Sequence, residues 1–308
     1  MLKPPALRPG DRIALVAPAS PFSREEFDAG VAELRRLGYE PVYDERVFAR
    51  SRYTAGDAAL RTRAFVDAWR DPAIRALLAV RGGYGSVELL PRLPIDDLRR
   101  TPKAFIGYSD NTSLLTWLTG HCGLVSFHGP MIEGRLARGP AGYDPDTFAR
   151  VLTRAEPPGR IAHSAVETIR AGEAAGILVG GTLTQLAASL GTPYAFDPPA
   201  GHILFIDEVA ERPYRIDRML TQLRFAGVLG RASAIVFGEL PRCDEPQPGG
   251  LVIRDILGDL LDGFPGPVLF GLPSGHTNGA CLTLPLGVRA HVVTSGGPAL
   301  IIEEAAVS

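Results

Sequence analysis

Short apolar runs alternate with amphipathic stretches along the first half of the chain. Runs over Arg12–Pro18, Ile74–Val80 and Ala104–Tyr108 have the length and the flanking turn residues of buried strands. Between them, Arg24–Leu37 and Thr112–Thr119 carry apolar residues at helical spacing. Strands that alternate with helices in this way indicate a parallel sheet with helices on both faces. Further elements expected here are a short strand at Glu40–Tyr43, a helix at Asp57–Ala68 and a helix that starts over Ser86–Leu90.

The second half shows the same two periodicities with a larger share of short apolar runs. The late segments are short and β-rich, which favours a mixed or barrel-like sheet beside the helices. Strands are expected at Gly201–Ile206, Ala234–Gly238, Val268–Phe270 and Arg289–Thr294, and helices at Thr182–Leu190, Tyr214–Ala226 and Val252–Leu261.

A stretch with many Gly, Pro and polar residues, from about 139 to 172, separates these two patterns. Such composition is typical of a connection between domains. We therefore predict an N-terminal α/β domain over residues 1–150, a linker over 151–175 and a smaller β-rich α/β C-terminal domain over 176–308.

Composition narrows the classes of function. The 308 residues are 45% hydrophobic and 21% charged, with a formal net charge of −2. This is ordinary for a folded globular protein, and it lacks the basic field that would favour nucleic acid or an anionic membrane as partner. No apolar run is as long as a membrane-spanning helix needs, and the first residues are typical of a mature cytoplasmic N-terminus. The widely spaced Cys122, Cys243 and Cys281 argue against a disulfide framework or a zinc site, and we expect no cofactor.

Two polar segments of the first half follow predicted strands. In the glycine loop Ala79–Ser86, backbone N–H groups can approach a phosphate or an oxyanion, although a tight strand-to-helix turn explains the same residues. Ser109 opens a polar cluster directly before a helix, which is the setting of a nucleophile elbow, although helix capping alone also explains it. Both loops would lie at the carboxyl ends of parallel strands, where ligands bind.

Two further segments that could carry chemistry lie in the second half of the chain. Asp207 and Glu208 end an apolar strand, where a carboxylate can orient a histidine for base catalysis or can simply be solvated. His276 lies in a loop rich in Gly and Pro and has the most active-site-like setting of the six histidines, with His128 second. No HExxH or similar ligand spacing exists, so metal catalysis is unsupported and we expect no metal site.

Taken in order, seven segments resemble the LD-carboxypeptidases, serine peptidases of the family that also contains the microcin C immunity peptidases. The resemblance covers nearly the whole chain, and it implies a flavodoxin-like N-terminal half, a smaller β-rich C-terminal domain and a homodimer. The segments are IALVAPAS, RGGYG, IGYSDNTSLL, SFHGPM, LVGGTLTQLAASLGTP, LFIDEVAERPYRIDRMLTQL and GLPSGHTNGACLTLPLG.

The resemblance implies a Ser–acid–His triad in which Ser109 is the nucleophile and His276 the general base. The family's acid is normally a glutamate, but an ungapped match places Asp207 there, with Glu208 one position later. We predict Asp207, because alternate strand residues face opposite sides. Glu208 is the alternative if the strand carries a bulge. The site would then lie between the two halves, whose relative orientation could gate it.

The resemblance also implies an oxyanion hole made of backbone N–H groups. The candidates are Gly83 or Tyr84 in the glycine loop, together with Asp110 directly after the nucleophile. A peptide substrate with a free carboxylate implies an arginine near the cleft. Arg81 is the best-placed candidate in the sequence and Arg218 the next.

The implied substrate is a muropeptide tetrapeptide, from which the enzyme removes the terminal D-alanine behind an L-configured diamino acid centre during cytoplasmic cell-wall recycling. One alternative is a microcin C immunity-type peptidase that cleaves aminoacyl-nucleotide conjugates with the same triad. That role favours aromatic residues that stack on a nucleobase, and neither Trp69 nor Trp117 lies beside the triad motifs. An alternative from another class is a catalytically inactive peptide-binding protein, for which the aspartate at the acid position is the only motive.

Overall fold

The computed structural model describes all residues from Met1 to Ser308 and contains two sheets. The first sheet has the strand order β12-β5-β4-β3-β1-β2. Its strands are β1 (Arg12–Val16), β2 (Glu40–Val42), β3 (Ile74–Ala79), β4 (Ala104–Gly107), β5 (Ser126–His128) and β12 (Leu284–Leu286). The first five are parallel in the order 2-1-3-4-5, which is the flavodoxin-like order that the family resemblance implied.

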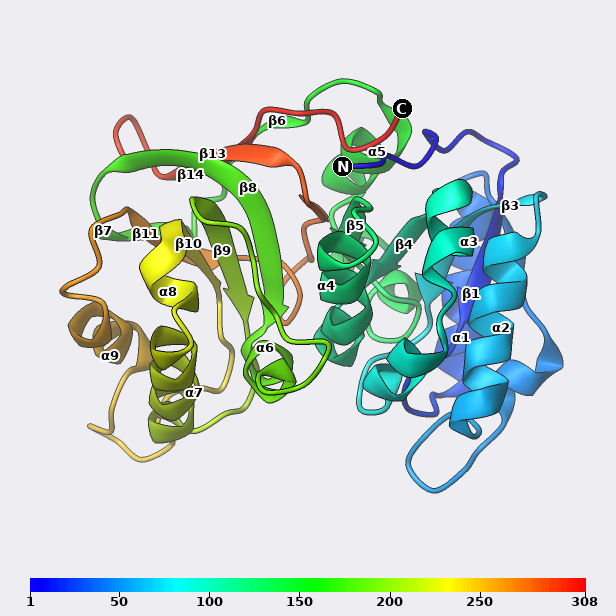
Figure 1. Ribbon diagram of the computed structural model, residues 1–308, viewed down its shortest axis with the longest axis horizontal. Coiled ribbons are helices and arrows are strands. Elements are labelled where there is room, and N and C mark those ends of the chain that lie inside the picture. The colour runs from blue at the N-terminus through cyan, green and yellow to red at the C-terminus, as the bar shows by residue number, and fades with distance from the viewer.

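Helices cover both faces of this sheet, as the alternating pattern predicts (Figure 1). The helix α1 lies on one face, and α2, α3 and α4 lie on the other. Their bounds are α1 (Arg24–Arg36), α2 (Ala58–Arg70), α3 (Ile95–Arg100) and α4 (Thr112–Gly120), with short 3-10 helices η1 (Glu45–Phe48), η2 (Ser86–Arg92), η3 (Ser109–Asn111) and η4 (Leu136–Ala141). The helix expected to start over Ser86–Leu90 is present as the 3-10 helix η2, which contains Pro91, a residue that cannot donate a backbone hydrogen bond.

The second sheet is mixed, with the strand order β6-β14-β13-β8-β9-β10-β11-β7. Its centre, from β8 to β11, is parallel and its outer strands are antiparallel. Because β6 and β7 lie at opposite edges, the sheet is open rather than a barrel. Its strands are β6 (Gly159–Ile161), β7 (Glu167–Arg170), β8 (Glu173–Thr182), β9 (His202–Asp207), β10 (Ala232–Gly238), β11 (Val268–Leu272), β13 (Arg289–Val293) and β14 (Ala299–Ile302).

The helices of this half pack against the second sheet and enclose a separate cluster of 21 buried apolar residues. They are α6 (Leu183–Ser189), α7 (Pro213–Phe225), α8 (Val228–Arg231) and α9 (Ile253–Leu260). The other buried face of the sheet contributes residues such as Phe205 and Val236 to a cluster of 63 that extends through the first sheet. One continuous core therefore joins the halves, which is unlike two domains around a loose hinge.

The segment expected to be a linker carries regular structure. The helix α5 (Pro145–Thr153) buries Phe148, Val151 and Leu152, and within residues 151–175 the strands β6 and β7 form both edges of the second sheet. This segment is polar because edge strands and a surface helix each expose one side. The domain boundaries themselves stay a prediction.

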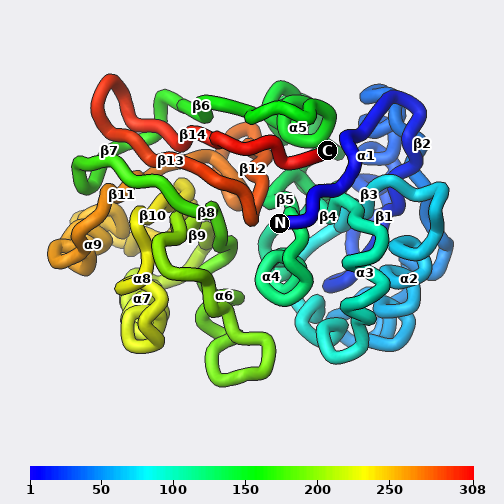
Figure 2. The backbone as a smooth tube through the Cα atoms, turned by 45° about the horizontal axis from the view of Figure 1, so that its top comes forward, coloured from blue at the N-terminus to red at the C-terminus, as the bar shows by residue number.

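The C-terminal part of the chain returns to the first half. The strand β12 pairs antiparallel with β5. The last residue, Ser308, accepts a hydrogen bond from Ala6 N and donates its own N–H to Pro4 O, each at 2.9 Å. Figure 2 shows the two chain ends close together between the halves. None of the helices combines the length and the apolarity that crossing a bilayer requires.

Candidate active site

Ser109 lies on a tight turn between β4 and α4. Its φ of +63° is in the left-handed region, which is uncommon for a residue with a side chain. Such a conformation turns the side chain out of the strand direction, as in a nucleophile elbow. The turn is packed closely: a Cβ atom added at Gly82 would lie 2.7 Å from Ser109 Cβ and 2.9 Å from its Oγ. The glycine loop therefore lies directly against the serine, as the two strand ends predicted.

Asp207 is the last residue of β9 and is completely buried. One carboxylate oxygen accepts hydrogen bonds from His276 Nδ1 at 2.8 Å and from Thr182 Oγ1 at 3.2 Å. The other accepts the backbone N–H of His276 at 3.0 Å. Both oxygens thus fix the position of His276, one through its ring and one through its backbone.

His276 lies in the loop after β11, and its side chain is 17% exposed. Burial alone would lower the pKa of this imidazole, but the charge of Asp207 and the hydrogen bond to it outweigh burial and raise the pKa. With Nδ1 held by Asp207, Nε2 is the ring nitrogen left to take up a proton. The ring edge packs against Tyr108, the residue before Ser109, with the ring centres 5.1 Å apart. The structure therefore brings the serine turn, the histidine and Asp207 together from three distant segments.

Glu208, the alternative acid, points away from this cluster. Its carboxylate accepts the backbone N–H and the hydroxyl of Thr184 at 2.8 and 2.7 Å, and the N–H of Val209 at 3.0 Å. Burial raises the pKa of Glu208. The carboxylate thus holds the start of α6, while Asp207 alone contacts His276.

The glycine loop presents its two candidate N–H groups differently. The N–H of Tyr84 already donates to Ser20 Oγ at 3.1 Å, and the Ser20 hydroxyl donates to Tyr53 O at 2.9 Å. Gly83 has a φ of +102°, and a side chain there would collide with Ser20. Of the two, only the N–H of Gly83 makes no hydrogen bond within the protein.

Asp110 contributes to the same loop through its side chain. Its carboxylate accepts the Ser86 N–H at 2.8 Å, and the Ser86 hydroxyl donates to the Asp110 carbonyl at 2.6 Å. Burial raises the pKa of Asp110. The residue after Ser109 therefore fastens the end of the glycine loop, and a Cβ at Gly82 would lie 3.4 Å from its backbone nitrogen.

The guanidinium of Arg81, the first candidate for binding a substrate carboxylate, already has partners within the protein. Its Nε lies 2.9 Å from a carboxylate oxygen of Glu133, and its Nη1 donates to Pro21 O at 2.8 Å. The side chain is 45% exposed, which leaves part of the guanidinium open to solvent. Arg218 is exposed on α7.

His128 is a completely buried histidine beside the same carboxylate. Its Nε2 lies 4.0 Å from Asp207 and has no hydrogen-bond partner, while its Nδ1 lies 3.0 Å from Ser274 Oγ. Burial lowers the pKa of His128 to about 4, so the ring is neutral at pH 7. The motif SFHGPM marked this residue only as a second candidate. A further arginine, Arg135, gave no signal in the sequence, because isolated arginines occur throughout the chain.

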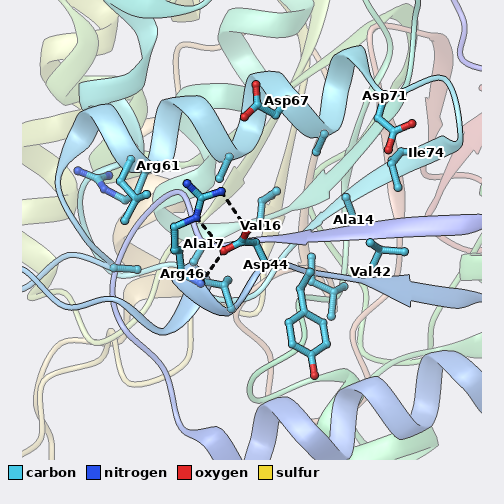
Figure 3. A pocket seen from close by; sticks show the side chains of 17 residues that line it. Ala14, Val16, Ala17, Val42, Asp44, Arg46, Arg61, Asp67, Asp71 and Ile74 are labelled. Atoms are coloured by element: carbon cyan, nitrogen blue, oxygen red, sulfur yellow. Dashed lines mark hydrogen bonds and ion pairs between the residues drawn. The ribbon is translucent and has the colours of Figure 1, made fainter.

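Two cavities lie away from this cluster. One of about 230 Å³ lies between α2 and the strands β1 and β2, beside Asp44, Arg46 and Arg61 (Figure 3). The other, of about 680 Å³, lies between α4 and β8 and reaches Tyr194. None of the candidate site residues lines either cavity. No group of three or more His, Cys, Asp or Glu side chains is arranged to hold a metal ion.

Two domain families match the chain over most of its length. The LD-carboxypeptidase N-terminal domain matches residues 13–129, and the LD-carboxypeptidase C-terminal domain matches residues 175–292. The chain belongs to the LD-carboxypeptidase family. The family assignment confirms the resemblance that the seven sequence segments indicated, and it makes the protein a carboxypeptidase.

Relatives of this LD-carboxypeptidase include both types of enzyme that the sequence suggested. The murein tetrapeptide carboxypeptidase of Pseudomonas aeruginosa is 33% identical, over 86% of this chain and 88% of its own. The crystal structure of the muramoyltetrapeptide carboxypeptidase of Oxalobacter formigenes has a TM-score of 0.84 at 31% identity and covers 96% of this chain and 100% of its own. The structure of MccF in complex with glutamyl sulfamoyl guanosine has a TM-score of 0.88 at 26% identity, with both chains fully covered.

Proposed function

We propose that this protein is a serine-type LD-carboxypeptidase that releases the terminal D-alanine from muropeptide tetrapeptides. The amide it hydrolyses joins an L-configured diamino acid centre to D-alanine. The observation that carries the proposal is the arrangement of Ser109, His276 and Asp207. The residue before the left-handed Ser109, Tyr108, packs its ring against a histidine whose Nδ1 is bound by a buried carboxylate. The relatives named as murein and muramoyltetrapeptide carboxypeptidases support this substrate class.

In this mechanism His276 Nε2 takes the proton of the Ser109 hydroxyl as Oγ attacks the amide carbonyl carbon. Asp207 keeps the second proton on Nδ1 and stabilises the imidazolium that forms. The tetrahedral intermediate collapses when His276 passes its proton to the leaving D-alanine amine, and the acyl-enzyme remains on Ser109. Water, activated by the same histidine, then releases the shortened peptide.

The oxyanion hole in this proposal consists of two backbone N–H groups, those of Gly83 and Asp110. Tyr84 is excluded as the loop donor because its N–H is already bound by Ser20. The missing side chain at Gly82 lets the glycine loop approach Ser109 and the N–H of Asp110 closely. A donor of this kind contributes about 3–4 kcal/mol to the stability of a tetrahedral transition state.

The carboxylate of D-alanine needs a positive partner in the cleft. We assign Arg81 to this role, because its half-exposed side chain leaves the glycine loop beside Ser109. Glu133 already neutralises part of its charge, so we expect a weak carboxylate site. Substitution Arg81→Gln would then raise KM by about threefold to tenfold, which corresponds to the loss of one solvent-exposed charged hydrogen bond.

The proposal is tested with purified protein and a tetrapeptide that ends in L-diamino acid–D-alanine. Free D-alanine is followed by mass spectrometry for the wild type and for Ser109→Ala, whose smaller side chain leaves the turn intact. Release by the wild type alone supports both the reaction and the nucleophile. Release by both proteins would reject Ser109 as the nucleophile, and release by neither would reject this substrate.

One observation favours a second candidate, the microcin C immunity-type reaction. Tyr53 and Tyr84 are 58% and 46% exposed and form an edge-to-face pair with ring centres 5.4 Å apart. Because Tyr84 belongs to the glycine loop, this pair offers an aromatic surface beside the site, on which a nucleobase can stack. The same assay with an aminoacyl sulfamoyl nucleoside, read as release of the amino acid, distinguishes the two reactions. The inactive binding protein is the remaining alternative only if both substrates fail.

We also propose that the protein acts in the cytoplasm, where cell-wall recycling handles muropeptides. We further propose that it forms the homodimer that the family resemblance implies. Light scattering during size-exclusion chromatography measures the oligomeric state. Fractionation of the source cells, followed by immunoblotting, measures the location. A monomeric mass or a periplasmic signal would contradict the respective part of this proposal.

A further inference from the structure

Arg135 is a buried arginine that the proposed mechanism does not use. It lies on the segment that leaves the first sheet after β5, directly before η4, and it is only 6% exposed. Its guanidinium donates hydrogen bonds to four carbonyl oxygens and one tyrosine hydroxyl, and to no carboxylate. Burial of a charged group without a countercharge costs free energy. An arginine kept in such a place therefore calls for a role beyond filling space.

The carbonyl partners of Arg135 surround the base. Nη2 donates to Gly275 O at 2.8 Å and to Thr277 O at 3.1 Å, the two residues on either side of His276. Nη1 donates to Gly279 O at 3.0 Å, further along the same loop. One planar group thus fixes the loop backbone before and after the histidine.

The same guanidinium also contacts the nucleophile turn. Its Nε donates to Tyr108 Oη at 3.3 Å, and its central carbon lies 5.8 Å from the centre of the Tyr108 ring. Tyr108 precedes Ser109 and packs against the ring of His276. Arg135 therefore contacts both the residue before Ser109 and the two residues on either side of His276.

The far end of the loop is fastened separately. Cys281 N donates to Gly142 O at 3.1 Å, and Asp144 N donates to Cys281 O at 3.0 Å. These bonds are backbone contacts that do not depend on a side chain. Glu239 accepts the backbone N–H and the side-chain amide of Asn278 at 2.8 and 3.1 Å. Arg135 is the side chain that binds the backbone carbonyls on both sides of His276.

We propose that Arg135 is the positioning residue that holds the His276 loop in line with Ser109. The inference rests on the proposed function, since it concerns the same serine and histidine. The role needs the planar guanidinium, which spans several acceptors at once, and not only a positive charge. A displacement of about 1 Å at a reacting group costs about 100-fold in rate.

The charge of Arg135 has a second effect, which distinguishes this role from simple packing. It lowers the pKa of His276, whereas Asp207 and Glu208 raise it. The remaining titratable groups around the ring, His128 and Tyr108, are neutral at pH 7 because burial lowers the pKa of one and raises that of the other. Removal of the Arg135 charge therefore shifts the pKa of His276 upward.

The test compares Arg135→Gln, which removes the charge, with Arg135→Lys, which keeps the charge but loses the planar group. Lys103→Gln is the matched control. Lys103 is also 6% exposed and also donates to backbone carbonyls, those of Ala68 and Asp71, at the end of β4 remote from Ser109. All three variants are expected to lower the melting temperature.

Only the Arg135 variants are expected to lower kcat, by about 10- to 100-fold, with KM changed less than about threefold. In Arg135→Gln, the fall of kcat/KM at acid pH is expected to begin at a higher pH, because the pKa of His276 rises. In Arg135→Lys, which keeps the charge, the fall is expected at the same pH as in the wild type. Lys103→Gln keeps the kcat and the pH profile of the wild type. If Arg135→Gln does not accumulate as folded protein, the kcat of Arg135→Lys is used to test the positioning role.

Two measurements without substrate separate this inference from the proposed function. Amide hydrogen exchange over residues 275–280 is expected to accelerate in Arg135→Lys and not in Lys103→Gln. The pKa of His276, measured by NMR of its ring nitrogens, is expected to rise in Arg135→Gln. If the wild type is inactive on every substrate but both changes occur, the proposed function fails and the positioning role stands. Unchanged loop exchange, or wild-type kcat in Arg135→Lys, overturns the role.

Discussion

The serine turn and the histidine loop reach their positions by different physical means. Backbone shape positions Ser109, through its own left-handed conformation and through a loop whose glycines have no room for a side chain. Buried polar contacts position His276, through Asp207 and through the carbonyls that Arg135 binds. The proposed nucleophile is therefore expected to be sensitive to added volume, and the proposed base to the loss of hydrogen bonds and charge.

The largest effect is expected from Asp207→Asn. The amide keeps the shape of the side chain but favours the wrong tautomer of His276, which in Ser–His–Asp triads costs about 10⁴-fold in kcat. The measurement is kcat for D-alanine release at the pH optimum. A loss below about tenfold would show that Asp207 is not the acid of the triad.

Asp207→Glu refines the same test, because it introduces the longer acid that is usual in the family. Both oxygens of Asp207 are bound, and a Cβ at Gly275 would lie 2.5 Å from one of them, so the buried site has little room for another methylene. We expect the variant to be about tenfold slower than the wild type. If Asp207→Glu is faster than the wild type, then the aspartate has impaired the triad, and the site is not adapted to the shorter acid.

On the serine side, Gly82→Ala is expected to reduce kcat by about 100-fold. The added methyl group meets Ser109 Cβ and Oγ, so the serine or the loop must move by a fraction of an ångström or more. Gly120→Ala, whose Cβ meets nothing within 4 Å, is the control for a glycine substitution. Equal activities of the two variants would contradict the positioning of Ser109 by loop shape.

The pH profile tests the electrostatic side of the comparison. Because Asp207 raises the pKa of His276 above its ordinary value of 6.5, the free base is lost as the pH falls through a value above 6.5. Below that value kcat/KM should fall about tenfold for each pH unit. In Asp207→Asn the acid limb should move to lower pH. An acid limb below pH 6 in the wild type would contradict the raised pKa.

The smallest effect on activity is expected from Glu208→Gln. Glu208 binds Thr184 and Val209 rather than His276, so kcat should change less than about threefold. The loss of charged hydrogen bonds at the start of α6 should lower the free energy of unfolding by about 1–2 kcal/mol. Denaturant unfolding and kcat are measured on the same preparation. A large loss of activity without loss of stability would return Glu208 to the candidates for the acid.

Local patterns predicted where the loops of this site lie, and the family resemblance supplied the roles of their residues. The ends of β3 and β4 were visible as apolar runs followed by Gly or polar residues, and parallel topology then placed both loops at one edge of the sheet. Strand alternation selected Asp207 over its neighbour, and the structure shows Asp207 as the one that contacts His276. The loop positions needed only residues close together in the sequence, whereas the choice of Asp207 also used the match to the family's acid position.

The remaining features depend on contacts between distant residues. The strand β8 was missed because Gly176, Gly180 and Gly181 weaken the strand pattern, and the reason for Gly181 is a close approach to Thr112. The N–H of Tyr84 was an open candidate until Ser20 was seen to bind it. The role of Arg135 depends on carbonyls about 140 residues away, which no local pattern reports.

The pairing of β12 with β5 has a consequence for the synthesis of this protein. The edge of the first sheet stays unpaired until residues 284–286 have left the ribosome, although Ser109 and its glycine loop are made long before. An exposed strand edge is a template for aggregation, so the nascent N-terminal half is at risk until β12 has been made. Chains truncated shortly before residue 284 should therefore accumulate as insoluble protein, even though every strand of the flavodoxin-like order is present in them.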